Sequence, residues 1–249
     1  MLTDEELLRY SRQIMLPELD VAGQEKLRSA SVLVVGLGGL GSPVAMYLAA
    51  AGVGKLVLVD HDQVDLSNLQ RQISHTTDRI GEDKVASAAV TLKQLNPGCA
   101  VDAMKVRLSE GNADNLVSTC DVIVDCSDNF AVRFLLNKLS VKHNKPLVSG
   151  AAIRLDGQVS VYDPRDVRSP CYRCLFDETG EEDLRCSTNG VLAPLVGLVG
   201  SVQATEAIKV IADVGEPLVG RLLIIDALNM NFRSVKIKPN PNCPVCSSK

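Results

Sequence analysis

The stretch SVLVVGLGGLGS, residues 31–42, constrains the fold of this 249-residue chain more than any other. An apolar run, residues 32–35, leads into Gly36, Gly38 and Gly41, and an apolar, helix-like segment follows. A strand, a G-x-G-x-x-G loop and a helix in this order open a nucleotide-binding α/β fold. The glycines let the backbone turn tightly and approach phosphates, and the helix N-terminus favours their negative charge.

Strand-like runs alternate with helix-like segments as far as Gly150, which predicts a parallel, doubly wound sheet. Thr3 and Glu6 fit a capping box that opens a short N-terminal helix, with Leu7, Leu8 and Ile14 on its apolar face. The other expected elements of this part are strands at residues 32–35, 55–60, 100–106, 122–125 and 146–149, and helices at residues 23–30, 42–51, 83–95, 109–118 and 129–143.

The pattern changes after Gly150. A strand is expected at residues 158–162, and two strand-like runs at 222–225 and 233–237 are spaced closely enough for an antiparallel hairpin. The fold class is therefore α/β: a Rossmann-like doubly wound sheet, parallel on its N-terminal side, with antiparallel strands toward the C-terminus. The expected elements between these strands are a loop-rich stretch at residues 163–189 and a helix at residues 192–212.

The composition excludes several functional classes. Lys and Arg number 26 against 30 Asp and Glu, so the net charge of −4 lacks the basic surplus of a nucleic-acid binder. The most apolar stretch, residues 191–202, contains Pro194, Gly197 and Gly200 and is shorter than the roughly 20 apolar residues of a membrane-spanning helix. The acidic start, MLTDEELLRY, lacks a secretory signal pattern. We therefore expect a cytoplasmic protein that binds neither nucleic acid nor membrane.

The residues after the second strand discriminate between nucleotides. Asp60 ends that strand, where an acid can hold ribose hydroxyls in an NAD site and an ATP site alike. The segment SNLQRQ, residues 67–72, is cationic and rich in amides. An NAD site has no obvious use for it, whereas a triphosphate needs its charge balanced beyond the α-phosphate. Lys84 follows at the start of a helix, either as a phosphate contact or as an ordinary solvated lysine.

A further carboxylate comes from VDCSDN, residues 124–129. Asp128 follows a buried strand, at the edge of the sheet where open α/β folds bind ligands. A carboxylate there could hold Mg²⁺ against phosphate oxygens. The alternative is that Asp128 caps the next helix, a position that Asp favours.

Four of the eight cysteines form two C-x-x-C pairs, Cys171 with Cys174 and Cys243 with Cys246. In a cytosolic α/β chain, two such pairs far apart in sequence predict a structural Cys₄ zinc site. Two redox-active pairs are the alternative. The three cysteines expected to be small core residues are Cys99, Cys120 and Cys126.

Together the motifs resemble the ubiquitin-activating-like adenylyltransferases, the HesA/MoeB/ThiF family. The resemblance runs from Leu7 to Cys246 and implies one adenylyltransferase domain over residues 1–249. Its parts would be N-terminal helices (1–30), a nucleotide-binding part (31–150) and a carrier-binding part with the zinc knuckles (151–249). The motifs that carry the resemblance are GLGGLG, LVDHDQVDLSNLQRQ, GEDKV, DCSDN, SGAAIRLDGQ and the two C-x-x-C pairs.

The resemblance also implies residue roles. Asp60 would hold the ribose, Lys84 would contact phosphate, and Asp128 would position Mg²⁺. Arg12, which the residues alone would place on a helix surface, matches an arginine that reaches into the partner's site of a homodimer. Cys186 matches a thiol that can bond to the carrier or transfer sulfur, although a spare loop thiol fits equally. The nucleotide-binding residues implied are Gly36, Gly38, Gly39, Gly41, Asp60, Ser67, Asn68, Leu69, Gln70, Arg71, Lys84, Asp128 and Asn129, with Asn68 and Arg71 toward the phosphates.

The implied reaction is ATP-dependent adenylation of the C-terminal glycine of a small ubiquitin-like sulfur carrier ending in Gly-Gly, with release of pyrophosphate. The attacking α-carboxylate has a pKa of roughly 3.5 and is ionised at neutral pH, so no general base is needed. His61, His75 and His143 are therefore expected to be structural or exposed. Catalysis would come from Arg12, Arg71 and Lys84, with Mg²⁺ on Asp128.

The stretch SGAAIRLDGQ, with no appended rhodanese or ubiquitin-fold domain, favours the branch that activates the small subunit of molybdopterin synthase in molybdenum cofactor biosynthesis. The thiamine-pathway carrier is the alternative, because RYSRQI and CPVC resemble that branch equally. An NAD-dependent oxidoreductase would need a catalytic His or Tyr, and none stands out. A regulatory nucleotide binder without turnover is disfavoured by Arg71, Lys84 and Asp128.

Overall fold

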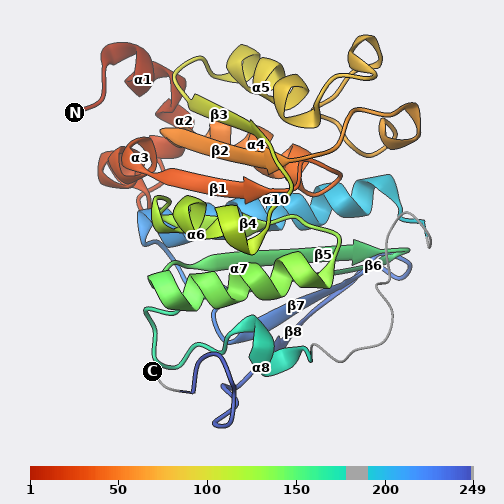
Figure 1. Cartoon of the computed structure of the whole chain (residues 1–249). Coiled ribbons are helices and arrows are strands. Elements are labelled where there is room, and N and C mark those ends of the chain that lie inside the picture. The colour runs from red at the N-terminus through yellow and green to blue at the C-terminus, as the bar shows by residue number, and fades with distance from the viewer. Residues whose placement is uncertain (178–189, 248–249) are drawn as a thin grey trace.

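One eight-stranded sheet runs through the chain in the order β3-β2-β1-β4-β5-β6-β7-β8 (Figure 1). The computed structural model describes residues 1–177 and 190–247. The strands are β1 Ser31–Val35, β2 Lys55–Asp60, β3 Ala100–Lys105, β4 Val122–Asp125, β5 Leu147–Ile153, β6 Asp156–Tyr162, β7 Arg221–Asp226 and β8 Asn231–Lys236. The helices are α1 Asp4–Arg9, α2 Ser11–Ile14, α3 Asp20–Ser29, α4 Gly41–Ala50, η1 Leu66–Asn68, η2 Thr77–Arg79, α5 Lys84–Leu95, α6 Glu110–Ser118, α7 Phe130–His143, α8 Tyr172–Leu175 and α10 Ala193–Ala212.

The sheet has the predicted mixture of strand directions. Strands β3, β2, β1, β4 and β5 are parallel, and the pairs β5–β6, β6–β7 and β7–β8 are antiparallel. The strand order reverses between β1 and β4, which is where open α/β sheets bind ligands. Strand β5 extends to Ile153, four residues past its predicted end, because it pairs with β6 along its whole length.

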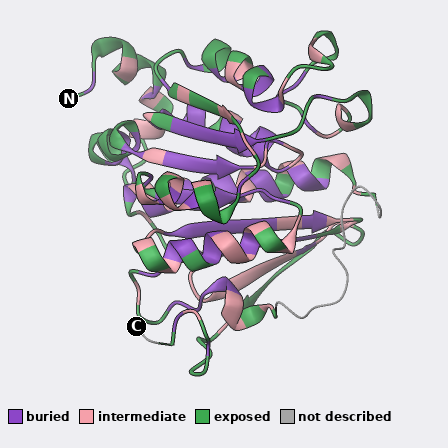
Figure 2. Ribbon diagram, in the orientation of Figure 1, coloured by how far each residue is buried: buried purple, intermediate pink, exposed green. Residues whose placement is uncertain are grey.

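The two faces of the sheet are covered by different helices (Figures 1 and 2). Alternate residues of a strand point to opposite faces, and β1 follows this rule. Val32 and Val34 pack in the cluster that includes α4, α5 and α10, whereas Leu33 and Val35 pack in the cluster that includes α6 and α7. Both faces of the central strands are therefore buried, as a parallel sheet requires.

The N-terminal segment differs from its prediction. The capping box is confirmed, since Glu6 N donates to Thr3 Oγ1 (3.2 Å) and Thr3 N donates to Glu6 Oε2 (2.7 Å). The chain then forms two short helices that meet at the buried Tyr10, whose hydroxyl accepts a hydrogen bond from Asn96. The prediction of one helix that carries Leu7, Leu8 and Ile14 is therefore wrong, and Leu7 and Leu8 are exposed.

Helix α10 packs beside the sheet rather than standing alone. Pro194 lies in its first turn, where proline is tolerated, and Gly197 and Gly200 continue the helix. By length and composition α10 could cross a membrane, but 56% of that window is buried inside the structure, as in the core helix of a soluble protein. It contacts α3, α4, β4, β5 and β6.

One polar side chain of α10 links the central strands. Gln203 is fully buried, and its Nε2 donates to Asp125 O (2.8 Å) and Val148 O (3.4 Å), at the end of β4 and within β5. Because both acceptors belong to neighbouring strands, this amide helps to fix the sheet edge from which the loop after β4 departs.

We expect Gln203→Met to lower the free energy of unfolding by about 1–3 kcal/mol, because methionine keeps the volume but donates no hydrogen bond. Urea unfolding followed by circular dichroism measures the loss. Thr205→Ala is the matched control on the same helix, since Thr205 is exposed and bonds only within α10. Equal stability of the Gln203 variant and the control would contradict this role.

Candidate active site

A cavity of about 960 Å³ lies at the carboxyl ends of the parallel strands, where the strand order reverses. It is lined by the last residues of β1 and β2, the loop after β4, and residues of β5 and β6. Its volume falls within the range of small-molecule pockets. The predicted site residues that line it are Gly36, Gly38, Gly39, Asp60, Arg71, Lys84, Asp128 and Asn129.

The glycine loop turns as tightly as its sequence predicts. Gly36 has a φ of +91°, and a Cβ atom on Gly41 would lie 1.8 Å from Gly36 O, so only glycine allows this return. Gly41 begins α4 and closes the turn without lining the cavity. The loop thus brings backbone and the start of α4 to the cavity, an arrangement that suits phosphate.

Asp60 and His75 hold the loop from both sides of Leu37. Asp60 Oδ2 accepts from Leu37 N (2.7 Å), and Asp60 Oδ1 accepts from Asp62 N (2.8 Å). His75 Nε2 lies 3.0 Å from Leu37 O and therefore carries the proton, while His75 Nδ1 accepts from Ser87 Oγ (3.0 Å). His75 is structural, as expected. The carboxylate oxygens of Asp60 keep free lone pairs for a ligand hydroxyl.

Lys84 is buried and paired rather than solvated. Its Nζ lies 2.9 Å from Asp62 Oδ2, and both residues line the cavity. Burial alone would raise the pKa of Asp62, but the hydrogen bond and charge of Lys84 outweigh it and lower that pKa. The interpretation of Lys84 as an ordinary solvated lysine is therefore wrong, and the cavity holds a fixed ammonium group.

The segment after η1 contributes Arg71 and, unexpectedly, Gln72. Arg71 Nη2 donates to Asn68 Oδ1 (3.0 Å) and Arg71 Nη1 to Ser67 O (3.2 Å). Ser67, Asn68, Leu69 and Gln70 do not line the cavity, so Ser67 and Asn68 support Arg71 rather than face the ligand space. Gln72 does line it, and its buried Oε1 has no hydrogen-bond partner within residues 1–177 and 190–247. The amide-rich run was the only sequence signal for it.

Asp128 faces the cavity instead of capping a helix. The cap of α7 is Asn129, whose side chain accepts from Val132 N (3.0 Å). Asp128 is exposed and free to bind a ligand, so its interpretation as an N-cap is wrong. One carboxylate on the cavity wall fits the donor set of Mg²⁺, which binds one or two protein carboxylates together with phosphate oxygens of a ligand.

Sequence reasoning missed several cavity residues. Arg107 Nη2 lies 2.8 Å from His61 Nε2 at the rim, and Arg133 lines the cavity from the second turn of α7. Phe130 and Phe176 add apolar wall. Arg133 lies four residues after the cap Asn129, so helix spacing is the signal that would have placed both on one side of α7.

One predicted catalytic residue, Arg12, does not line this cavity. Arg12 lies on α2 and is exposed, away from the lining of its own chain. Cys186 lies outside the described residues.

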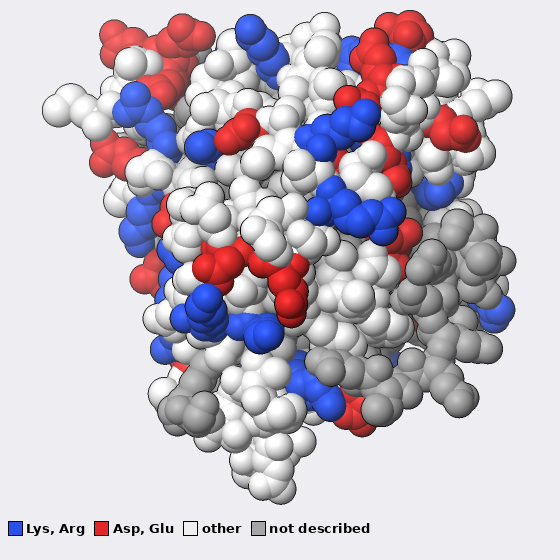
Figure 3. Space-filling model, in the orientation of Figure 1, with Lys and Arg blue, Asp and Glu red and all other residues white. Residues whose placement is uncertain are grey.

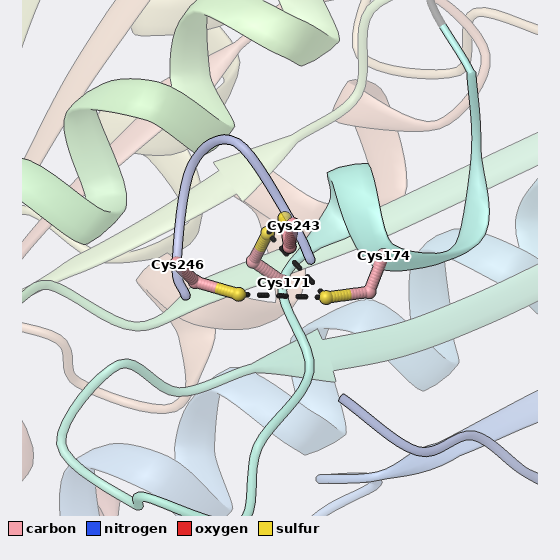
Figure 4. A group of neighbouring side chains, drawn as sticks. All are labelled: Cys171, Cys174, Cys243 and Cys246. Carbon is pink, nitrogen blue, oxygen red and sulfur yellow. Dashed lines mark hydrogen bonds between the residues drawn. The ribbon is translucent and has the colours of Figure 1, made fainter. Parts of the chain in front are cut away.

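The four paired cysteines come together in one cluster (Figure 4). Their Sγ atoms all lie within 4.8 Å of one another, with Cys171–Cys243 at 3.6 Å and Cys174–Cys246 at 3.4 Å. A tetrahedral site with Zn–S bonds of about 2.3 Å separates its sulfurs by about 3.8 Å. The thiols of both pairs thus face one shared point, which fits a zinc ion better than two separate redox pairs.

Burial raises the pKa of Cys171 to about 11 and also raises the pKa of Cys246, whereas the pKa of Cys243 is lowered. Burial would raise the pKa of Cys243, but backbone N–H groups of Val245 and Cys246 outweigh it and lower that pKa to about 7. Cys99, Cys120 and Cys126 are buried core residues, as expected, and burial raises the pKa of each. A lowered pKa favours the thiolate form, which is the form that binds a metal, at Cys243.

Charged residues of both signs are interspersed on the face that carries α6 and α7 (Figure 3). No broad basic surface covers the described part of this face, in keeping with the net charge of −4.

Comparison with known proteins identifies relatives over the whole chain. The ThiF family matches residues 10–245. The molybdopterin-synthase adenylyltransferase of Escherichia coli (strain K12) is 47% identical over 245 residues, which cover 98% of each chain. The adenylyltransferase and sulfurtransferase MOCS3 of Drosophila sechellia is 47% identical over all of this chain, which spans 55% of that longer protein.

Solved structures share the architecture. The crystal structure of E. coli MccB with ATP superposes with a TM-score of 0.84 at 25% identity, over 96% of this chain and 74% of that chain. PaaA superposes with a TM-score of 0.83 at 25% identity, over 96% of this chain and 76% of that one.

The neutral state of His75 predicts a loss of stability in acid. Burial lowers the pKa of His75 from 6.5, so below that pH the unfolded chain binds a proton that the folded chain does not. The contribution of His75 to the free energy of unfolding is complete above pH 6.5 and falls as the pH drops toward the lower folded-state pKa.

Urea unfolding at about pH 7.5 and about pH 5.5 should therefore show a larger acid loss for the natural chain than for His75→Gln, which does not titrate. His61→Gln is the matched control at an exposed position. An equal acid loss in the natural chain and His75→Gln would contradict the assignment.

Proposed function

The chain belongs to the ThiF family, and from this premise we propose that it transfers AMP from ATP to the C-terminal carboxylate of a sulfur-carrier protein. The carrier is the small subunit of molybdopterin synthase, and the step serves molybdenum cofactor biosynthesis. The proposal rests mainly on the 47% identity to the E. coli molybdopterin-synthase adenylyltransferase over 98% of both chains. It favours this branch over the thiamine pathway, and the cavity supplies the groups that the chemistry requires.

The reaction brings two anions together. A carboxylate oxygen of the carrier bonds to the α-phosphorus of ATP, the bond from that phosphorus to the bridging oxygen breaks, and pyrophosphate leaves. The carboxylate is ionised at neutral pH, so no side chain needs to take a proton from it. What the protein supplies is positive charge held in place, and Lys84 and Arg71 are two cavity cations that neighbouring side chains hold.

The remaining groups bind the nucleotide. The loop with Gly36, Gly38 and Gly39 would receive the phosphates, and Asp60 would accept hydrogen bonds from the ribose hydroxyls. The unpartnered Gln72 Oε1 would accept a further hydrogen bond from the ligand. Asp128 would hold Mg²⁺ with Asn129 beside it, and a bound Mg²⁺ would neutralise charge on the phosphates.

A homodimer would supply Arg12. Leu8, Met15 and Leu16 flank Arg12 and expose 78%, 69% and 53% of their surface. Large apolar side chains gathered on one exposed segment indicate an interface. A second copy of the chain packed on this segment would bury these three side chains and place Arg12 at the partner's cavity. This arrangement would account for the position of Arg12 away from the cavity of its own chain.

The remaining assignments complete the proposal. The four-cysteine cluster would hold structural zinc, Cys186 would take part in carrier or sulfur chemistry, and the carrier would bind to residues 151–249. The protein would act in the cytoplasm.

Carrier-dependent exchange between ATP and labelled pyrophosphate tests the function. Exchange should require the small subunit of molybdopterin synthase and should fail with the thiamine sulfur carrier. Lys84→Met should slow exchange by about 10²–10³-fold, the loss typical of one electrostatic group. Lys93→Met, exposed on the same helix, is the control. Exchange with the thiamine carrier alone would contradict the pathway, and exchange with neither would contradict the function.

Mixing two inactive variants tests the role of Arg12. If Arg12 acts in the partner's site, a heterodimer of Arg12→Ala and Asp128→Asn has one intact site. Random re-association should then restore about a quarter of the natural activity. Activity that stays at the level of the separate variants would show that Arg12 does not act across a dimer.

A further inference from the structure

Helix α7 connects the nucleotide cavity with the four-cysteine cluster. Its cap, Asn129, lies on the cavity, Arg133 lies one turn later, and Asn137 follows after one more turn. Residues four apart lie on the same side of a helix, so one side of α7 faces the cavity at its start and the cysteines further along. Arg133 and Asn137 are both buried.

Asn137 uses both ends of its amide on the first C-x-x-C pair. Its Oδ1 accepts from Tyr172 N (2.8 Å), and its Nδ2 donates to Cys171 Sγ (3.6 Å). The backbone N–H can only donate, which fixes the orientation of the amide. Hydrogen bonds to a ligating sulfur orient the ligand and tune the site. Asn137 is therefore placed to support the metal site directly from α7.

Tyr172 links Asn137 to the cavity wall. Its ring is buried and stacks on Phe176 with ring centroids 4.5 Å apart, and it meets Phe134 edge-on at 5.4 Å. Phe176 lines the cavity two residues after Cys174. The segment that holds two of the thiols is thus also a wall of the nucleotide cavity.

Arg133 links Tyr172 to the loop that presents Asp128. Arg133 Nη2 donates to Ser127 O (2.8 Å), and Ser127 N and Oγ both donate to Asp125 Oδ1 (3.0 and 2.6 Å). The Tyr172 hydroxyl is buried beside the guanidinium of Arg133, which counteracts the rise that burial causes in the pKa of Tyr172. A shift of Tyr172 would therefore disturb the arginine that holds this loop.

We propose that Asn137 is a positioning residue that couples metal binding at Cys171, Cys174, Cys243 and Cys246 to nucleotide binding in the cavity. The bound metal fixes Tyr172 and Phe176, and these fix Arg133 and the loop before Asp128. The inference rests on the proposed function in taking ATP as the ligand. Because coupling between two binding sites is reciprocal, ATP must strengthen metal binding by the same factor as the metal strengthens ATP binding.

The test measures both directions on the full chain. Calorimetry gives the Kd of MgATP for zinc-loaded and chelator-stripped protein, and a colorimetric chelator follows zinc release with and without saturating MgATP. Excess magnesium keeps ATP itself from binding zinc. We expect stripping to weaken MgATP binding on the order of tenfold, and MgATP to slow zinc release.

Asn137→Ala separates coupling from folding, because it leaves all four cysteines in place. The zinc-loaded variant should bind MgATP more weakly, again on the order of tenfold, and MgATP should no longer slow its zinc release. Its zinc affinity should fall about 10–100-fold, the usual effect of losing a partner of a metal ligand. Lys138→Ala, exposed on the same helix, should behave as the natural chain.

Three outcomes would overturn the coupling. An equal Kd for MgATP in the loaded, stripped and Asn137→Ala proteins would show that the sites are independent. If stripping unfolds the chain, an unchanged Kd in zinc-loaded Asn137→Ala would do the same. No MgATP binding by the zinc-loaded natural chain would instead remove the proposed function, and the coupling with it.

Discussion

The site depends on how closely the chain returns on itself after β1. Gly41 approaches Gly36 O at a distance that no side chain permits, and the backbone of Leu37 is held by Asp60 on one side and His75 on the other. This turn brings the loop and the start of α4 to the carboxyl edge of the sheet. The other groups of the cavity are arranged around the space that it opens.

The cations of the cavity and the residues that hold its walls in place come from different parts of the chain. The part of the chain before Gly150 supplies the buried Lys84, held by Asp62, and Arg71, held by Asn68. The part after Gly150 supplies Gln203, which links β4 to β5, and the cysteine segment that lies behind the cavity wall. Phosphate chemistry needs cations that do not move, and fixed partners inside a packed wall provide this.

Local patterns predicted much of the fold. Strands β2 and β4 begin and end at their predicted residues, and the glycine loop and the cysteine cluster follow from their spacing. Tertiary pairing decided the rest: β6 lengthens β5, and the short N-terminal helices expose Leu8. Gln72 and Asn137 escaped prediction because their roles depend on partners distant in sequence, which spacing does not reveal.

The most direct test of the central claim uses a carrier whose terminal carboxylate is labelled with oxygen-18. If that carboxylate attacks the α-phosphorus, cleavage of the acyl bond by a sulfur nucleophile leaves one labelled oxygen on the AMP. Mass spectrometry of the released nucleotide should therefore show singly labelled AMP. Unlabelled AMP, or ADP as the product, would contradict adenylation of the carrier by this chain.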